Sequence, residues 1–167
     1  MGGLSGARGP QAMIFSTVAE FKSALPQIAR LIGLDLGEKT IGLALSDNLR
    51  LIASARTNLK RSKFSTNAAE IEQLIAREEV GGVVIGLPLN MDGSSGPAAQ
   101  AARAFARNFA ARCPLPLLLW DERLSTAAVT RTLIAADTSR QRRREVVDKM
   151  AAAYILQGAL DAMRHTP

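Results

Sequence analysis

The sequence predicts an α/β domain with one mixed sheet and helices on both of its faces. Short apolar runs alternate with amphipathic segments over most of the chain, and the first two runs are separated by only a three-residue turn, as in a hairpin. The chain has 167 residues, and neither an internal repeat nor a linker divides it. We therefore expect one domain.

The N-terminal segment is expected to lie outside this domain. Residues 1–16 contain four glycines and have the composition of a loose leader. Residues 17–27 have the pattern of a short amphipathic helix that ends near Pro26, because proline cannot continue a helix. The sequence thus predicts an N-terminal extension over residues 1–28 and the main domain over residues 29–164.

The main domain is predicted to begin with three strands. Residues 31–36 are almost continuously apolar, as in a strand that is covered on both faces. After the turn at Gly37-Glu38-Lys39, residues 40–46 form the second arm of a hairpin, and residues 51–58 are expected to form a third strand.

Helices and strands alternate in the rest of the domain. A helix over residues 68–79 is expected to stop at Gly81-Gly82, since glycine commonly follows a helix end. The later elements are predicted to be a strand over residues 83–87, a helix over 97–112, a strand over 115–120, and helices over 125–136 and 144–163.

Composition and charge point to an anionic partner. The chain carries a formal net charge of +6 and has an isoelectric point near 10.2, which favours nucleic acid. No apolar run approaches the ~20 residues that a membrane span requires, and the N-terminus lacks the pattern of a signal peptide. We therefore expect no membrane partner and a cytoplasmic protein. The single cysteine, Cys113, excludes an intrachain disulfide.

Acidic residues interrupt apolar structure at three places. Asp35 lies within the first apolar strand, Asp121 and Glu122 follow another strand, and Asp148 begins an apolar row on the last helix. Because side chains alternate along a strand, only one of Asp121 and Glu122 should face a shared site. Carboxylates that converge repel each other, and Mg²⁺ removes this conflict. Two such ions can hydrolyse a phosphodiester without a protein nucleophile.

Each acid also has an ordinary structural explanation. These explanations are a turn cap by Asp35 on the amide of Gly37 or Lys39, a solvated turn at Asp121-Glu122 before a helix capped by Ser125, and a surface pair between Asp148 and Arg144. Three acids at the edges of apolar elements together favour a shared site over three separate coincidences.

Four segments resemble the YqgF family, and they occur in its order. They are Asp35-x-Gly37 with Lys39, Gly42 and the ALSD at residues 44–47; GLPLNMDG at 86–93; DERLST at 121–126; and Val147-Asp148-Lys149 with the residues that follow up to Gln157. Members of this family are also called RuvX, pre-16S ribosomal RNA nucleases or Holliday-junction resolvase homologues. The resemblance runs from about residue 31 to residue 160, and GLPLNMDG with DERLST is highly specific. Glu38 is a small departure, because the family commonly has small or hydroxyl residues there.

The resemblance implies a ribonuclease H-like fold whose first three strands form an antiparallel meander, followed by parallel strands. It implies a catalytic site of Asp35, Asp121, Glu122 and Asp148 that uses Mg²⁺ or Mn²⁺. Related resolvases carry a glutamate at the end of the fourth strand, where this chain has Gly86-Leu87-Pro88. The second metal ligand must then come from Asp121 or Glu122. We favour Glu122 for its longer side chain, which makes Asp35, Glu122 and Asp148 the predicted metal ligands.

Basic and polar residues near these motifs are candidates for contacts with a nucleic-acid backbone. For the charged residues the alternative is a solvated charge or an ordinary ion pair, and for Asn90 it is a turn before a helix. The candidates are Lys39, Asn90, Arg123, Arg140, Arg142 and Arg143.

Three functions are compatible with the sequence. The first, implied by the family, is a nuclease that trims the 5′ end of the small-subunit ribosomal RNA precursor. The second is a junction-resolving DNA nuclease, which should be a homodimer so that two sites cut symmetrically; the sequence leaves monomer and homodimer open. The third is a nucleic-acid-binding factor, acting in transcription, with little hydrolytic activity.

Overall fold

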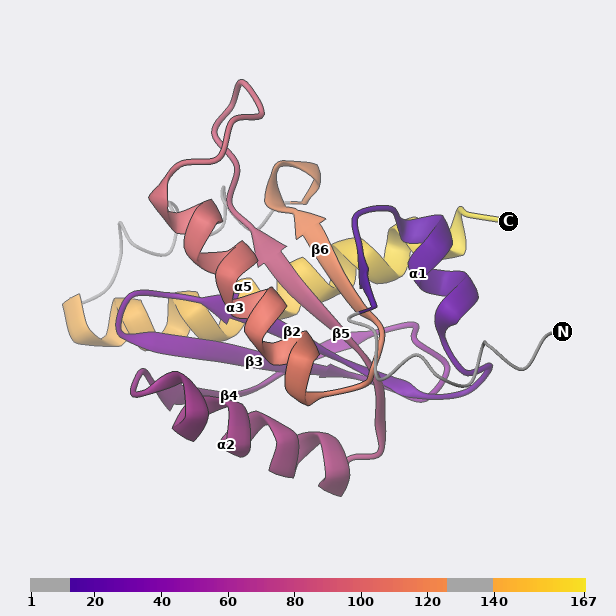
Figure 1. The fold of residues 1–167 in the computed structure, drawn as a ribbon, viewed down its shortest axis with the longest axis horizontal. Coiled ribbons are helices and arrows are strands. Elements are labelled where there is room, and N and C mark those ends of the chain that lie inside the picture. Colours follow the sequence, from indigo (N-terminus) through magenta and orange to yellow (C-terminus); the bar gives the residue numbers. More distant parts are fainter. Residues whose placement is uncertain (1–12, 126–139) are drawn as a thin grey trace, which may run out of the picture.

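Six strands form one mixed sheet in the order β1-β6-β5-β2-β3-β4 in the computed structural model (Figure 1). The model describes residues 13–125 and 140–167, and the side chains of 13–125 and 150–167. The strands are β1 (Ile14–Phe15), β2 (Arg30–Leu36), β3 (Thr40–Ser46), β4 (Ala53–Lys60), β5 (Val80–Leu87) and β6 (Leu117–Asp121). β2, β3 and β4 are antiparallel neighbours, and β5 and β6 join β2 in parallel. The predicted meander with added parallel strands is confirmed.

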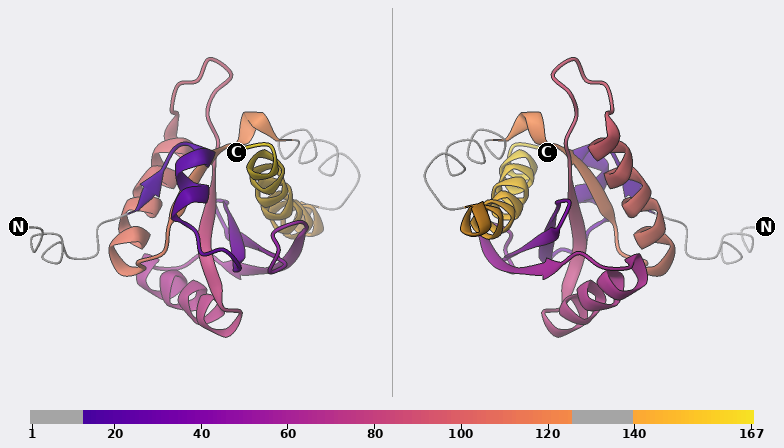
Figure 2. Two further views of the ribbon diagram at one scale, coloured as in Figure 1. Left: turned by 90° about the vertical axis from the view of Figure 1, so that its right-hand side faces the viewer. Right: turned by 90° about the vertical axis from the view of Figure 1, so that its left-hand side faces the viewer.

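The helices cover both faces of the sheet, as predicted. They are α1 (Val18–Ala24), α2 (Phe64–Arg77), α3 (Pro97–Arg112) and α5 (Arg140–Arg164), with a short 3₁₀ helix η2 (Glu122–Leu124) after β6. Figure 2 shows α2 and α3 on one side of the sheet and α5 on the other. None of the helices in the described ranges is long and apolar enough to cross a membrane.

Alternation along the strands divides the core into two layers. On β2, Ile32 and Leu34 pack with α2 and α3, whereas Leu31 packs with α5. Asp35 is four residues after Leu31, and because side chains alternate along a strand, it points to the same face, which α5 covers. On β6, Trp120 belongs to the same face. An acid that shares a site with Asp35 must therefore reach the face of the sheet that α5 covers.

The N-terminal extension departs from the expected loose leader. Ile14 and Phe15 form β1, which pairs in parallel with Leu117 and Leu118 of β6, and α1 packs against β1, β6 and α5. Two apolar residues are enough to cover part of the exposed edge of β6. Residues 1–12 lie outside the described part, and the division at residue 28 stays a prediction.

The glycine pair at 81–82 does not stop a helix, contrary to the prediction. α2 ends at Arg77, and Glu79 takes the left-handed conformation there with φ of 53°. Gly81 and Gly82 lie inside β5. The reason is packing: a Cβ on Gly82 would come within 2.5 Å of Leu25 Cδ2. Beyond Ser125, the predicted helix over 125–136 lies outside the described residues.

Candidate active site

Three parallel strands end side by side and bring two acids to one edge of the sheet. Leu34 of β2 pairs in register with Ile85 of β5, and Gly86 of β5 pairs with Trp120 of β6. Asp35, Gly86 and the residue after β6, Glu122, therefore stand near the carboxyl ends of neighbouring strands. Ligands of open α/β sheets bind at this edge.

Asp35 is buried at the end of β2, with only 5% of its surface exposed. The turn that follows is held by other groups: the Gly37 amide donates to the Thr40 carbonyl over 2.9 Å, and Arg61 Nη1 donates to the Gly37 carbonyl over 2.8 Å. The Gly37 amide is thus used within the hairpin, which removes one of the two bonds in the turn-cap explanation for Asp35.

Glu122 is buried to the same degree, at 4% exposed, and it begins η2. Its carboxylate lies over the backbone of Gly86: Oε2 is 2.9 Å and Cδ is 3.2 Å from the position that a Cβ on residue 86 would take. Glu122 thus extends from the end of β6 across β5, in the direction of β2. A side chain at position 86 would occupy this space.

Asp121 has a different environment from Glu122. It accepts hydrogen bonds from Arg123 in a two-pronged ion pair, Nε to Oδ1 at 3.0 Å and Nη2 to Oδ2 at 2.7 Å. These bonds from the Arg123 side chain, with a further bond from its backbone amide, hold the pKa of Asp121 below its usual value. The two neighbouring acids therefore have unlike surroundings, in line with strand alternation.

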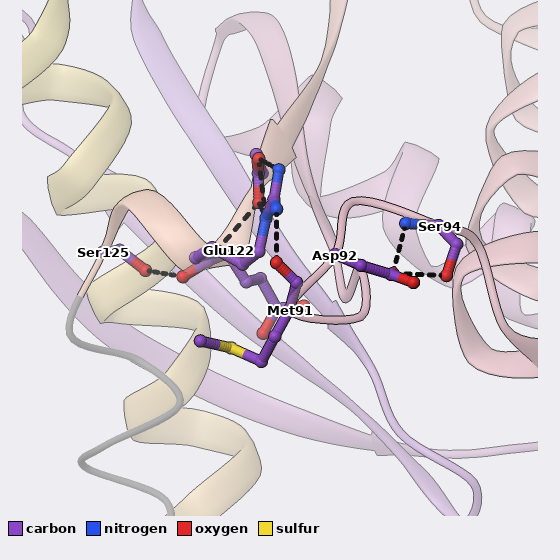
Figure 3. Close-up of polar contacts among 7 residues, drawn as sticks. Met91, Asp92, Ser94, Glu122 and Ser125 are labelled. Atoms are coloured by element: carbon purple, nitrogen blue, oxygen red, sulfur yellow. Dashed lines mark hydrogen bonds and ion pairs between the residues drawn. The ribbon is translucent and has the colours of Figure 1, made fainter.

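Arg123 also connects η2 to the loop between β5 and α3, on which Figure 3 shows Met91, Asp92 and Ser94. Its Nη1 donates to the Met91 carbonyl over 3.2 Å. Within the loop, the Asn90 amide donates to the Ser94 carbonyl, and Asp92 Oδ1 accepts from the Ser94 amide and hydroxyl over 2.9 and 2.6 Å. The Ser94 hydroxyl is the main cause of a lowered Asp92 pKa. The predicted phosphate contact Asn90 is exposed, and its side-chain amide donates to Ser94 Oγ.

Three lysines lie at the open end of the β3–β4 hairpin, opposite its turn. Lys39 is exposed in the β2–β3 turn, and its carbonyl accepts from the Arg61 amide over 2.8 Å. Lys60 ends β4 opposite Thr40, and Lys63 precedes α2. None of these three lysines has a salt bridge to an acid within the described ranges. Sequence reasoning missed Lys60 and Lys63; the signal was the basic run at residues 60–63, directly before a helix.

Several predicted residues fall where side chains are not described. Arg140, Arg142, Arg143, Arg144 and Asp148 lie in the first turns of α5, whose backbone alone is given there. The backbone places Asp148 one turn before Ala152. A Cβ on Gly33 would lie 3.0 Å from the Ala152 carbonyl oxygen, so α5 crosses β2 closely at a point two residues before Asp35. The roles of these five side chains stay predictions.

The described donors fit a divalent cation that prefers oxygen. Asp35 and Glu122 supply two buried carboxylates, and the missing side chain at Gly86 provides the space in which one of them lies. Within residues 13–125 and 150–167 no group of three potential metal ligands occurs. A third protein ligand would have to come from outside these ranges, where the predicted ligand Asp148 lies.

Comparison with known proteins identifies the family of this chain. The family described as "RuvX: Holliday junction resolvase" matches residues 29–162. A protein from a Jannaschia species is 60% identical over 156 residues, which cover 92% of this chain and 98% of the relative. One from a Ruegeria species is 52% identical over 153 residues, covering 92% and 98%. Both carry the name "Putative pre-16S rRNA nuclease".

The fold also matches a solved structure. T. thermophilus RuvC in complex with a Holliday junction substrate superposes with a TM-score of 0.52 at 14% identity, covering 83% of this chain and 97% of that one. At this identity the match concerns the fold alone, and it confirms the predicted ribonuclease H-like class.

Proposed function

This chain belongs to the RuvX family, and on that premise we propose that it is a metal-dependent nuclease that processes the 5′ end of the 16S ribosomal RNA precursor. Hydrolysis of phosphodiester bonds follows from the family. The substrate is proposed from the names of the relatives, which are 52–60% identical in the two cases given above.

One observation supports the catalytic part most directly: Glu122 places its buried carboxylate over Gly86, at the edge where Asp35 is buried on the neighbouring strand. Burying two carboxylates is costly unless positive charge or hydrogen bonds compensate. Related resolvases carry a glutamate at the end of the fourth strand, where this chain has Gly86. In our proposal Glu122 takes the place of that glutamate, because it reaches the same strand end from η2.

We assign Asp35, Glu122 and Asp148 as metal ligands, with Mg²⁺ or Mn²⁺ as the ion. When bound, such an ion activates water and stabilises the charge that develops on the phosphate. Asp121 holds Arg123 rather than the metal, and so orients η2 and the carboxylate of Glu122. Lys39, Lys60 and Lys63 are exposed cations at the same end of the sheet, where they attract phosphates by charge.

Branched DNA is the alternative substrate, and the description of the family favours it. A junction resolvase needs two sites that cut together, so this function would require a homodimer, whereas trimming one RNA end is possible for a monomer. A cytoplasmic location agrees with either substrate and stays a prediction.

The deciding experiment presents both substrates to the full chain. A labelled 16S precursor RNA and a four-way DNA junction are digested side by side with Mg²⁺, with Mn²⁺ and with EDTA, and the Asp35→Asn variant serves as the control. We expect cleavage of the RNA near its mature 5′ end, with either ion and not with EDTA. Cleavage of the junction alone, by a dimer, would favour the alternative. Tight binding without any cleavage would contradict the nuclease and favour a binding factor.

A further inference from the structure

Met91 is the most exposed large apolar side chain in the described part of the chain, with 90% of its surface in solvent. A single exposed apolar residue is common on protein surfaces and needs no special explanation. Leu49, at 68% exposed in the β3–β4 turn, is such a case. Met91 differs from Leu49 in where it lies and in how its backbone is held.

The backbone of Met91 is fixed from both sides. Its carbonyl accepts from Arg123 Nη1, and the residue before it, Asn90, is bonded through its amide and carbonyl to Ser94 and Gly93 over 2.9 and 2.8 Å. Gly93 closes this turn with φ of 89°, a conformation that glycine adopts easily. The loop therefore presents Met91 from a hydrogen-bonded turn.

Arg123 also fixes where Met91 stands relative to the site. It is the next residue after Glu122, and it bonds Asp121 and the Met91 carbonyl with the same guanidinium group. Figure 3 shows Met91 and Glu122 on the two segments that this contact joins. A nucleic acid with its phosphate at Asp35 and Glu122 would thus pass the loop that carries Met91.

Methionine suits contact with a base. Its side chain is flexible and polarizable and packs well on aromatic rings. Proteins that kink or open nucleic acids often insert Met, Leu or Phe between neighbouring bases. Asn90, Asp92 and Ser94 bond mainly to one another within the loop. The Met91 side chain, by contrast, is exposed and available to a ligand.

We propose that Met91 is an apolar wedge that packs against a nucleobase beside the scissile phosphate and separates it from its neighbour. This inference rests on the proposed nuclease function. It implies that the enzyme acts where a base can be displaced at low cost, in single-stranded or branched regions. Packing of an apolar side chain reads no hydrogen-bond pattern, so the contact is expected to tolerate different bases.

The test uses 2-aminopurine, whose fluorescence rises when the base loses its stacking neighbours. An RNA covering the mature 5′ end of the 16S precursor carries this base beside the cleavage position, and a four-way DNA junction carries it at the branch. Binding is measured with full-length Asp35→Asn protein, which leaves the strand intact. We expect the fluorescence to rise on binding, to stay low when Met91→Ala is added, and to be restored by Met91→Leu.

Cleavage by otherwise unaltered protein gives a second measurement. Met91→Ala should lower kcat/KM by about tenfold, since burying some tens of Å² of apolar surface is worth a factor of that order. Met91→Leu should recover most of the rate, and the matched control Leu49→Ala should leave it unchanged. Thermal stability should be the same in all four proteins, because both side chains are exposed.

The outcomes separate this inference from the proposed function. A normal fluorescence rise with Met91→Ala, or an unchanged cleavage rate, would overturn the wedge while leaving the nuclease in place. If the unaltered protein cuts neither substrate, the proposed function fails, and the fluorescence on binding still decides the role of Met91. Absence of binding to both nucleic acids would overturn both.

Discussion

The carboxylate of Glu122 lies where a side chain on Gly86 would begin, with Oε2 2.9 Å from that position. The Gly86→Ala variant tests what this contact does. Its new Cβ would also meet Ile155 Cδ1 at 2.5 Å, so the local packing must shift. We expect a destabilisation of about 1–3 kcal/mol from overpacking, and a loss of cleavage larger than that destabilisation explains, because Glu122 is displaced.

Gly82→Ala is the matched control for this variant. It lies on the same strand, and its Cβ would meet Leu25 Cδ2 at the same 2.5 Å, away from both acids. Melting temperature and kcat are measured for the two variants under identical conditions. Equal activity per folded molecule in both would mean that the position of Glu122 over Gly86 has no catalytic consequence.

The four acids should respond unequally to neutral substitution. Asp35→Asn, Glu122→Gln and Asp148→Asn each remove a proposed metal ligand, and each should abolish cleavage while the fold is kept. Asp121→Asn should be milder, because Asp121 bonds Arg123. Activity is measured over a range of Mg²⁺ and Mn²⁺ concentrations, together with thermal unfolding. Full activity in any of the first three variants would remove that residue from the site.

Much of this arrangement was predictable from local patterns. The strand ending at Leu36 and the acid within it are visible in the sequence, because a charged residue in a continuous apolar run stands out. Alternation along β6 predicted that only one of Asp121 and Glu122 would face a shared site. The structure gives the two acids unlike contacts, Asp121 with Arg123 and Glu122 with Gly86, and the shared site itself stays a prediction. The functional roles of these acids remain predictions.

The features that sequence reasoning missed depend on tertiary contacts. The Gly81-Gly82 pair has the pattern of a helix end, and only the approach of Leu25 explains why glycine is needed inside β5. The edge strand Ile14–Phe15 is too short for any periodicity to reveal. The bond from Arg123 to the Met91 carbonyl joins residues 32 positions apart in the chain, so no local pattern marks Met91.

The pair of Asp121 and Arg123 should make stability depend on pH in a defined direction. Arg123 holds the pKa of Asp121 below its usual value of 3.8. The ionised form is therefore favoured by folding, so the stability that this group adds is complete above that value and is lost as the pH falls through the lowered pKa. Removing Arg123 should lower stability slightly near neutral pH, as for other surface pairs, and by less in strong acid, where the bond to the Met91 carbonyl is still made.

Thermal unfolding of Arg123→Gln and of the unaltered protein is compared from about pH 7 down to about pH 2. The difference in melting temperature should be present at the upper end and should shrink below the usual pKa of Asp121. In an Asp121→Asn background, Arg123→Gln should have a smaller effect, which separates this pair from the weaker attraction between Arg123 and Asp92. A difference that stays constant with pH would contradict this account.

Lys60 and Lys63 should contact phosphates from the open end of the β3–β4 hairpin, opposite its turn. β3 begins where β2 ends, and β4 returns antiparallel to it, so Lys60 comes back to the end of the sheet that carries Asp35. Each lysine that neutralises a phosphate releases counterions on binding, and each lost contact should reduce the log–log salt slope by about one. Lys60→Ala with Lys63→Ala should thus flatten the salt dependence by up to about two.

Arg77→Ala provides the matched control, since Arg77 is an exposed cation at the other end of α2, about 20 Å from Lys63 at 1.5 Å per residue. Binding of the Asp35→Asn protein to labelled RNA is measured across a salt series. The Arg77 variant should keep the slope, and the triple variant of Arg140, Arg142 and Arg143 should reduce it if these predicted contacts also form. Arg144 is left intact, because it is a candidate partner of Asp148.

The rate at saturating substrate should change little in the lysine variant, because these side chains would hold the strand without touching the reacting phosphate. An unchanged slope after loss of both lysines would show that their charges face only solvent.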